Sequence, residues 1–144
     1  MSVINHAPGM RRSSKLITFT GAANLGAVGT VPIFTVTGEV LIVVLTPYCT
    51  VDLTEAAPTA TLVLGVTGST SLFIGSTNAT VIDAGEFWNA ATVASANGLA
   101  VPAALKDIFI TDNIIATVGA QAVNGGALRF DCWWMPMSSD GNVS

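Results

Sequence analysis

Charged side chains are scarce in this sequence. Five basic and nine acidic residues make up 10% of the 144-residue chain, where about 25% is usual for a soluble domain. A folded monomer of this mass exposes roughly 7,000 Å², so each charge would serve about 500 Å² of surface. Monomers rarely expose apolar patches larger than a few hundred Å². We therefore expect other subunits to cover part of the surface; the alternative is a monomer with a neutral surface rich in Thr and Ser.

Long hydrophobic runs are also missing, although the mean hydropathy is +0.64. A membrane-spanning helix needs 18 or more consecutive apolar residues. The longest apolar run covers residues 40–45 and ends at Thr46 and Pro47. The first 15 residues contain no apolar stretch of the kind found in secretory signal peptides. We expect a soluble chain that is made in the cytoplasm and does not contact a membrane.

Histidine and cysteine, the residues most used in catalysis and zinc binding, are nearly absent. His6 is the one histidine, and it lies in a segment without predicted structure. General acid–base catalysis at neutral pH usually depends on histidine. Two cysteines and one histidine at these spacings match no recognised zinc site. We expect no enzymatic activity, no cofactor and no metal, and buried free thiols at Cys49 and Cys132; a disulfide between them remains open at this stage.

Two acidic pairs and one glycine-rich loop are the remaining candidates for chemistry. Asp83 with Glu86, and Asp107 with Asp112, could in principle act as paired carboxylates of a glycosidase. Each pair lies at a strand end or turn, where acidic residues commonly bond to the backbone. Residues 21–29 are rich in glycine but lack the Gly-Lys-Ser/Thr ending of a phosphate-binding loop. We interpret both pairs and the loop as structural.

The first 15 residues differ from the rest of the chain in charge. Arg11, Arg12 and Lys15 fall here with no acidic residue, so this segment carries +3 and the remainder −7. Pro8, Gly9 and two serines argue against regular structure in the segment. We predict an extended N-terminal arm over residues 1–15, which either docks on an acidic surface of a neighbouring subunit or stays solvated. Three charges on an otherwise acidic chain do not favour nucleic-acid binding.

The rest of the chain reads as short strands separated by turns. One segment, 31–37, has the character of an edge strand because Pro32 cannot donate a hydrogen bond, and 39–46 is apolar enough to be buried on both faces. The predicted strands are 16–20, 31–37, 39–46, 59–66, 71–76, 77–83, 108–110, 114–118 and 127–135. Residues 83–91 are expected to form a helical turn, and 92–105 a loop with one short helix. The pattern predicts an all-β fold, an antiparallel, jelly-roll-like β-sandwich over residues 16–137, with a tail at 138–144.

The last predicted strand alternates most clearly. Leu128, Phe130, Cys132 and Trp134 share one face of it. The other face carries Arg129, Asp131 and Trp133. A large aromatic side chain on a charged face is typical of a subunit contact, although cover for a loop explains it equally well. We take Arg11, Arg12, Lys15 and Trp133 as candidate partner contacts.

Three short stretches resemble small structural proteins of tailed bacteriophages and prophages. They are residues 19–40, which begin FTGAA and end FTVTGEV, residues 83–88 (DAGEFW) and residues 138–141 (SSDG). The resemblance implies a virion component, and head decoration (cement) proteins are the class within it that we choose. Such proteins are small and β-rich, often trimeric, and have arms that reach neighbouring capsid subunits.

The resemblance implies a capsid decoration subunit on the virion head surface, with itself and the major capsid protein as partners. It transfers no site residues, because none of the three stretches carries chemistry. Two alternatives stay open: a head-fibre base, neck or tail component of a virion, and a carbohydrate- or receptor-binding β-sandwich. For the last, Trp88 and Trp133 are the aromatic residues available to stack on a sugar.

Overall fold

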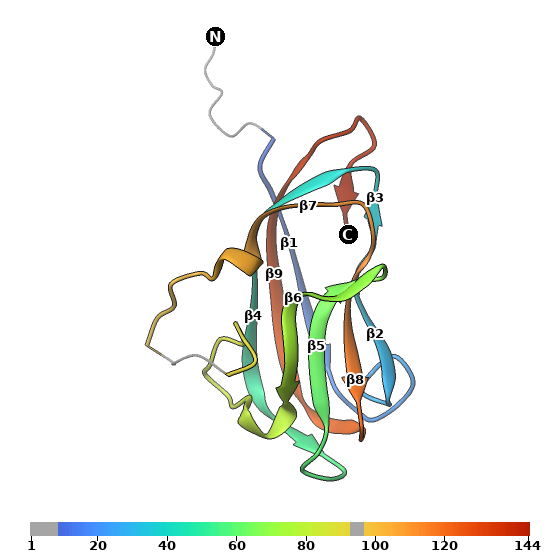
Figure 1. Cartoon of the computed structure of the whole chain (residues 1–144), viewed down its shortest axis with the longest axis vertical. Helices are drawn as coiled ribbons and strands as arrows, with labels where there is room; N and C mark the ends of the chain where they lie inside the picture. Colours follow the sequence, from blue (N-terminus) through green and yellow to red (C-terminus); the bar gives the residue numbers. More distant parts are fainter. Residues whose placement is uncertain (1–8, 93–96) are drawn as a thin grey trace.

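Two four-stranded antiparallel sheets pack face to face in the computed structural model, which describes residues 9–92 and 97–144 (Figure 1). The first sheet has the order β1-β9-β4-β7 and the second β2-β8-β5-β6. The short strands β10 and β3 form a separate pair at one end. The strands are β1 (Arg11–Thr18), β2 (Gly29–Phe34), β3 (Val36–Thr37), β4 (Val40–Glu55), β5 (Thr61–Val66), β6 (Ser69–Asn78), β7 (Lys106–Ile110), β8 (Ile114–Gly119), β9 (Val123–Pro136) and β10 (Asn142–Val143). The predicted all-β sandwich is confirmed.

The connections follow the jelly-roll pattern. Apart from β3, every consecutive pair of long strands crosses from one sheet to the other, except β5 and β6, which form a hairpin. Neighbouring strands within the first sheet are therefore distant in sequence, as β1 with β9. Crossing between layers in this way makes two interlocking Greek keys, which is the jelly roll.

The core lies between the sheets and is built by period-2 alternation. On β9, the predicted inward set is buried, with Leu128, Phe130 and Cys132 fully enclosed. The predicted alternation of this strand is thus confirmed. Strand β2 carries Pro32 and lies at the edge of the second sheet, as its missing N–H group requires.

The N-terminal segment is more regular than predicted. Arg11–Thr18 form strand β1, which pairs along its whole length with β9. The expectation of irregular structure is therefore wrong for residues 11–15, and residues 1–8 lie outside the described part of the chain. Ser13 and Ser14 suggest a loop by composition. They are held in the strand because Ser13 Oγ donates to Val143 O and Ser14 Oγ to Asp131 Oδ1.

Three further predictions differ from the structure. Strand β4 does not stop at Pro47 but continues to Glu55. Strand β6 runs without a turn through Ser76 to Asn78, so the predicted separate strand at 77–83 is wrong. Residues 83–91 form no helix: Phe87 bridges to Tyr48, and this segment extends along the side of β4. The short 3-10 helices are instead Ala79–Val81 and Ala103–Leu105, and the second confirms the short helix expected within 92–105.

The two cysteines are buried and free. Cys49 lies opposite Leu128 in the β4–β9 pair, whereas Cys132 lies opposite Leu45. The four-residue offset along the strands separates the thiols by roughly 13 Å. A disulfide needs Cα atoms within about 7 Å, so this fold does not allow one between them within the chain.

Within the described residues, no helix has the length and hydropathy needed to cross a membrane.

Candidate assembly surface

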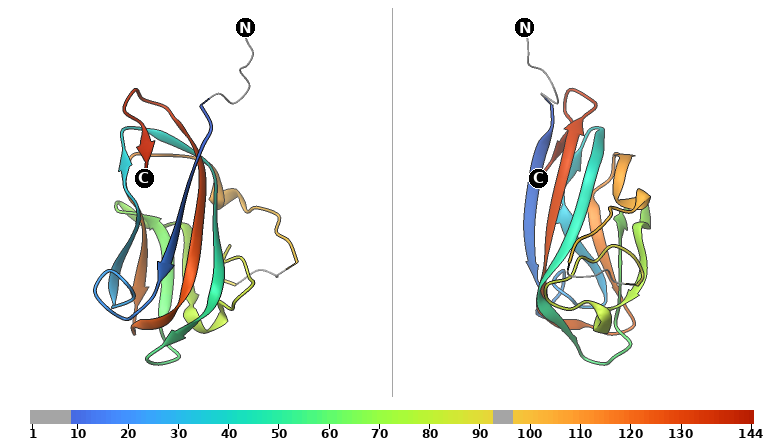
Figure 2. Two further views of the ribbon diagram at one scale, coloured as in Figure 1. Left: turned by 180° about the vertical axis from the view of Figure 1, so that it is seen from behind. Right: turned by 90° about the vertical axis from the view of Figure 1, so that its left-hand side faces the viewer.

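One face of the first sheet is turned away from the core, and Figure 2 (left) looks onto it. We call it the outer face. It presents the side chains of β1, β9, β4 and β7 that alternate with the core residues. Its members, arranged in cross-strand rows, are Phe109, Leu41 and Met135; Val44, Trp133 and Arg12; Thr46, Asp131 and Ser14; and Tyr48, Arg129 and Leu16.

Large apolar side chains stand exposed at two corners of the outer face. Phe109 on β7 is 69% exposed and Leu16 on β1 is 55% exposed. Between them, Trp133 and Tyr48 are half-buried. Tyr48 packs edge-on against Phe87, with 5.0 Å between ring centroids. Trp, Tyr, Phe, Met and Arg are the residue types enriched in protein–protein interfaces, and half of the outer-face members are of these types.

Arginines cover the two central aromatic rings. The guanidinium of Arg12 lies 5.4 Å from the ring centroid of Trp133, and that of Arg129 lies 5.1 Å from Tyr48. Both distances are in the range of cation–π attraction. Because each arginine is also bonded to Asp131, the rings are held in place by a network rather than by packing alone.

Asp131 is the centre of that network. Arg12 Nη2 donates to its Oδ1 at 2.6 Å and Arg129 Nε to its Oδ2 at 2.8 Å. The side chain of Asp131 is only 5% exposed, although it lies on the outer face. Burial by itself raises the pKa of this carboxyl, but hydrogen bonds from Ser14, Arg129 and Arg12 outweigh it and hold the pKa below its ordinary value. Asp131 therefore stays ionised and fixes both arginines flat against the sheet.

Strand β4 buries its apolar side chains fully on its inward side only. Its inward residues Val40, Ile42 and Leu45 are fully buried. Its outward residues Leu41, Val44 and Tyr48 remain partly exposed. The prediction that residues 39–46 are buried on both faces is therefore wrong for the isolated chain. An apolar strand face left partly open is what a subunit contact would cover.

The four candidate contact residues divide between two sides of the sheet. Arg12 and Trp133 lie on the outer face, where the structure brings them together. Arg11 and Lys15 alternate to the opposite side of β1, and Arg11 lies 5.6 Å from the ring of the core residue Trp134. Sequence reasoning missed Leu16, Tyr48 and Phe109. The alternation of β4 was the available signal for Tyr48, but the strand was expected to end before it.

Trp88, the other aromatic proposed for sugar stacking, is fully buried. Its Nε1 donates to Thr77 Oγ1 of β6 at 2.9 Å. Its backbone N–H donates to Pro47 O of β4 at 3.1 Å. Trp88 thus ties the two sheets together and offers no ring face to a ligand.

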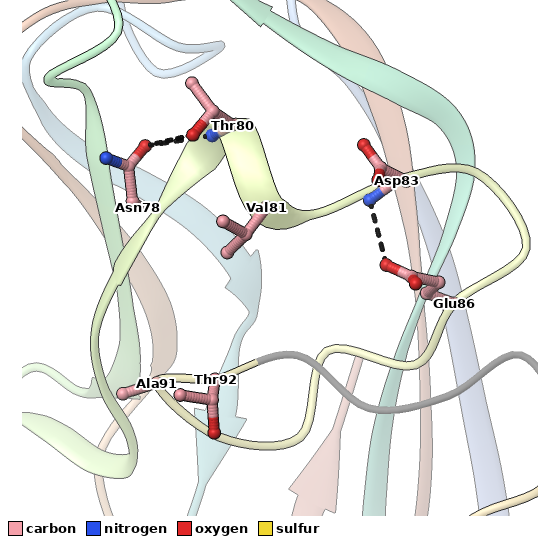
Figure 3. A pocket seen from close by; sticks show the side chains of 7 residues that line it. All are labelled: Asn78, Thr80, Val81, Asp83, Glu86, Ala91 and Thr92. Atoms are coloured by element: carbon pink, nitrogen blue, oxygen red, sulfur yellow. Dashed lines mark hydrogen bonds between the residues drawn. The ribbon is translucent and has the colours of Figure 1, made fainter.

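One carboxylate of each acidic pair bonds to the local backbone. Glu86 Oε2 accepts from the backbone N–H of Asp83 at 3.3 Å, at one side of an open hollow of about 480 Å³ lined also by Asn78, Thr80 and Val81 (Figure 3). Asp112 accepts from the N–H of Gly68. In the described part of the chain, no three His, Cys, Asp or Glu side chains are grouped closely enough to hold a metal ion.

Comparison with known proteins gives a likeness of fold. No family model matches the sequence, and no curated protein sequence matches it. The chain is similar to a chain of the solved structure titled "Cyanophage Pam1 capsid asymmetric unit", with a TM-score of 0.54 and 19% identity. The match covers 94% of this chain and 91% of that one. The chain therefore shares its whole fold with a component of a phage capsid structure.

Proposed function

We propose that this chain is a structural subunit of a bacteriophage virion, a capsid decoration subunit that binds the head lattice through its outer face. The observation that carries the proposal is the outer face itself, an exposed surface of aromatic and arginine side chains on a chain that is otherwise poor in charge. The fold likeness to a phage capsid component supports the same class. Fold alone does not determine function, so the proposal rests on the residues of the outer face.

The outer face has the composition and the order that docking requires. Exposed Phe109 and Leu16 supply apolar area, worth about 25 cal/mol per Å² when covered and before association costs are subtracted. Arg12 and Arg129 are pre-positioned by Asp131, so little side-chain entropy is lost when a partner binds. The partner is a neighbouring capsid subunit that presents an apolar patch with hydrogen-bond acceptors for the outer edges of the two guanidinium groups.

The direct test is addition of the recombinant chain to phage capsids that lack it, followed by sedimentation and quantification of the bound copies. We expect saturable binding with hundreds of sites per particle. Phe109→Asp with Leu16→Asp should weaken binding more than about tenfold, because each change places a charge where a large apolar side chain would be covered. The control, Thr70→Asp with Ser76→Asp, adds the same charge to exposed positions of β6 in the other sheet and should bind like the parent.

Two results would contradict the proposal. Purified virions without the protein would exclude a virion role, and equal binding by both double variants would exclude the outer face. A copy number of a few per particle would place the chain in a neck, tail or head-fibre base instead. A sugar-binding module is less well supported, because Trp88 is buried and the ring of Trp133 is covered by Arg12.

A further inference from the structure

The two sides of the first sheet carry opposite charge. One side is the edge strand β1 with Arg11, Arg12 and Lys15, which we call the basic edge. On the far side of β4 lie three carboxylates, Asp52, Asp83 and Glu86, which we call the acidic edge. In the view from behind, β1 and the 83–88 segment lie on opposite sides of β9 and β4 (Figure 2).

The acidic edge is built by hydrogen bonds between β4 and the 83–88 segment. Gly85 N donates to Cys49 O and Cys49 N to Glu86 O, both at 2.9 Å. Asp52 Oδ1 accepts from the N–H of Ala84 at 2.6 Å. These hydrogen bonds gather the three carboxylates along one part of the sheet side. Burial, with the negative charges of the three as a smaller cause, raises the pKa of the nearby Cys49 thiol to about 11.

Apart from Arg12, the charged side chains of the two edges form no ion pair within the described residues. Across residues 9–92 and 97–144, both ion pairs converge on Asp131, one from Arg12 and one from Arg129. Lys15 and the acidic edge lie on opposite sides of β9 and β4, about three strand spacings or 14 Å apart, so they do not meet in one chain. Among the strands that the structure describes, β1 pairs only with β9, so the backbone groups on its other side are left without a strand partner.

One residue of the basic edge, Lys15, lies nearly level with the acidic edge along the strands. Lys15 is opposite Phe130, and Phe130 is opposite Pro47. Pro47 O accepts from Trp88 N, two residues beyond Glu86. A second copy placed beside the first, without a shift along the strands, thus brings its Lys15 nearly level with Glu86 of the first. Arg11 and Arg12 lie further along the strands, at the level of Ile42 and Val44.

We infer that two copies of this chain associate head to tail, with the basic edge of one against the acidic edge of the next. A contact across a two-fold axis between two β1 strands would place six basic side chains together, and like charges opposite each other destabilise a strand pair. The charge pattern therefore selects a heterologous contact, which closes into a ring or continues as a filament. The inference does not depend on the proposed virion role.

The test is sedimentation velocity of the full chain over about a hundredfold range of concentration, in about 0.1 M and about 1 M salt, where the Debye length falls from about 10 Å to about 3 Å. We expect a mass above that of the monomer at low salt, with association at least about tenfold weaker at high salt. A mass that reaches a fixed value indicates a ring, and one that keeps rising indicates a filament; both support the contact.

Charge swapping makes the test specific. Arg11→Glu with Lys15→Glu should give a monomer, and adding Asp83→Lys with Glu86→Lys to that variant should restore association, because the quadruple variant has the parent's net charge with its edges exchanged. Thr70→Glu with Ser76→Glu is the control for added charge on β6 and should associate like the parent. Circular dichroism confirms that each variant is folded. A parent that is monomeric throughout at low salt, or a quadruple variant that stays monomeric while folded, would overturn the inference.

Discussion

Arg12 Nη2 lies 2.6 Å from Asp131 Oδ1, which joins the first strand of the chain to the last long one across 119 positions of sequence. Arg12 is about half exposed, while Asp131 is almost fully buried. The bond therefore fixes the orientation of an outer-face residue more than it stabilises the core. It also explains why the N-terminal segment is a strand, since Ser14 donates to the same carboxylate oxygen.

Replacement of that carboxylate should reduce stability in a pH-dependent way. We expect Asp131→Asn to lower the free energy of unfolding at pH 7 by about 1–3 kcal/mol, because three donors lose a charged acceptor. The loss of unfolding free energy should lie at the lower end of this range, since water screens both half-exposed arginines. Urea unfolding at several pH values is the measurement.

The shifted pKa of Asp131 determines how its contribution to stability changes with pH. The pKa of Asp131 is lower in the folded chain than in the unfolded chain. Its contribution is present above about pH 3.9, the ordinary pKa, and is lost as the pH falls through the folded value. The difference between parent and Asp131→Asn should therefore shrink at acidic pH. Asp107→Asn, an exposed position, serves as control, and a difference that does not change with pH would contradict the assignment.

The hydrogen bond between Trp88 and Thr77 should couple the two sheets energetically. Trp88→Phe removes the Nε1 donor and part of a fully buried ring, so we expect a loss of about 1–3 kcal/mol. Thr77→Val removes the acceptor. A double-mutant cycle by denaturant unfolding, followed by circular dichroism, isolates the pair. Strict additivity of the two losses would show that the bond contributes nothing.

Both thiols should be inert in the folded chain. Burial raises the pKa of Cys132 to about 12 and that of Cys49 to about 11, so almost no thiolate is present at pH 8. A thiol reagent should modify both residues only in denaturant, at the rate of unfolding. Thr70→Cys, on the exposed surface of β6, should react at once and validates the assay. Rapid modification of the native parent would mean that the core opens locally.

The bulge at the start of β9 should depend on a glycine. Gly126 has φ +94°, and a Cβ added there would collide with the backbone carbonyl oxygen of Asp52 on β4. Gly126→Ala should therefore cost more than about 1 kcal/mol. Gly75→Ala is the matched control: its Cβ would meet nothing within 4 Å, and its φ is not in the left-handed region, so little change is expected. Thermal unfolding of both variants provides the comparison, and equal midpoints would refute the role of Gly126.

Local sequence pattern was enough to predict the fold class and the inner face of β9. The alternation of β9 and the position of Pro32 are local properties, because side-chain direction in a strand repeats every two residues and proline lacks a donor wherever it is placed. The low charge likewise favours a surface that other subunits cover, which stays a prediction.

Features that depend on partners distant in sequence required the folded structure. Arg11–Lys15 form a strand because β9 lies beside them and Asp131 accepts two of their side-chain hydrogen bonds. The 83–91 segment extends along β4 because cross-strand bonds to Pro47 and Cys49 outweigh its weak helical preference. The outer face and the two charged edges have the same origin: crossing connections bring together residues that local pattern cannot relate.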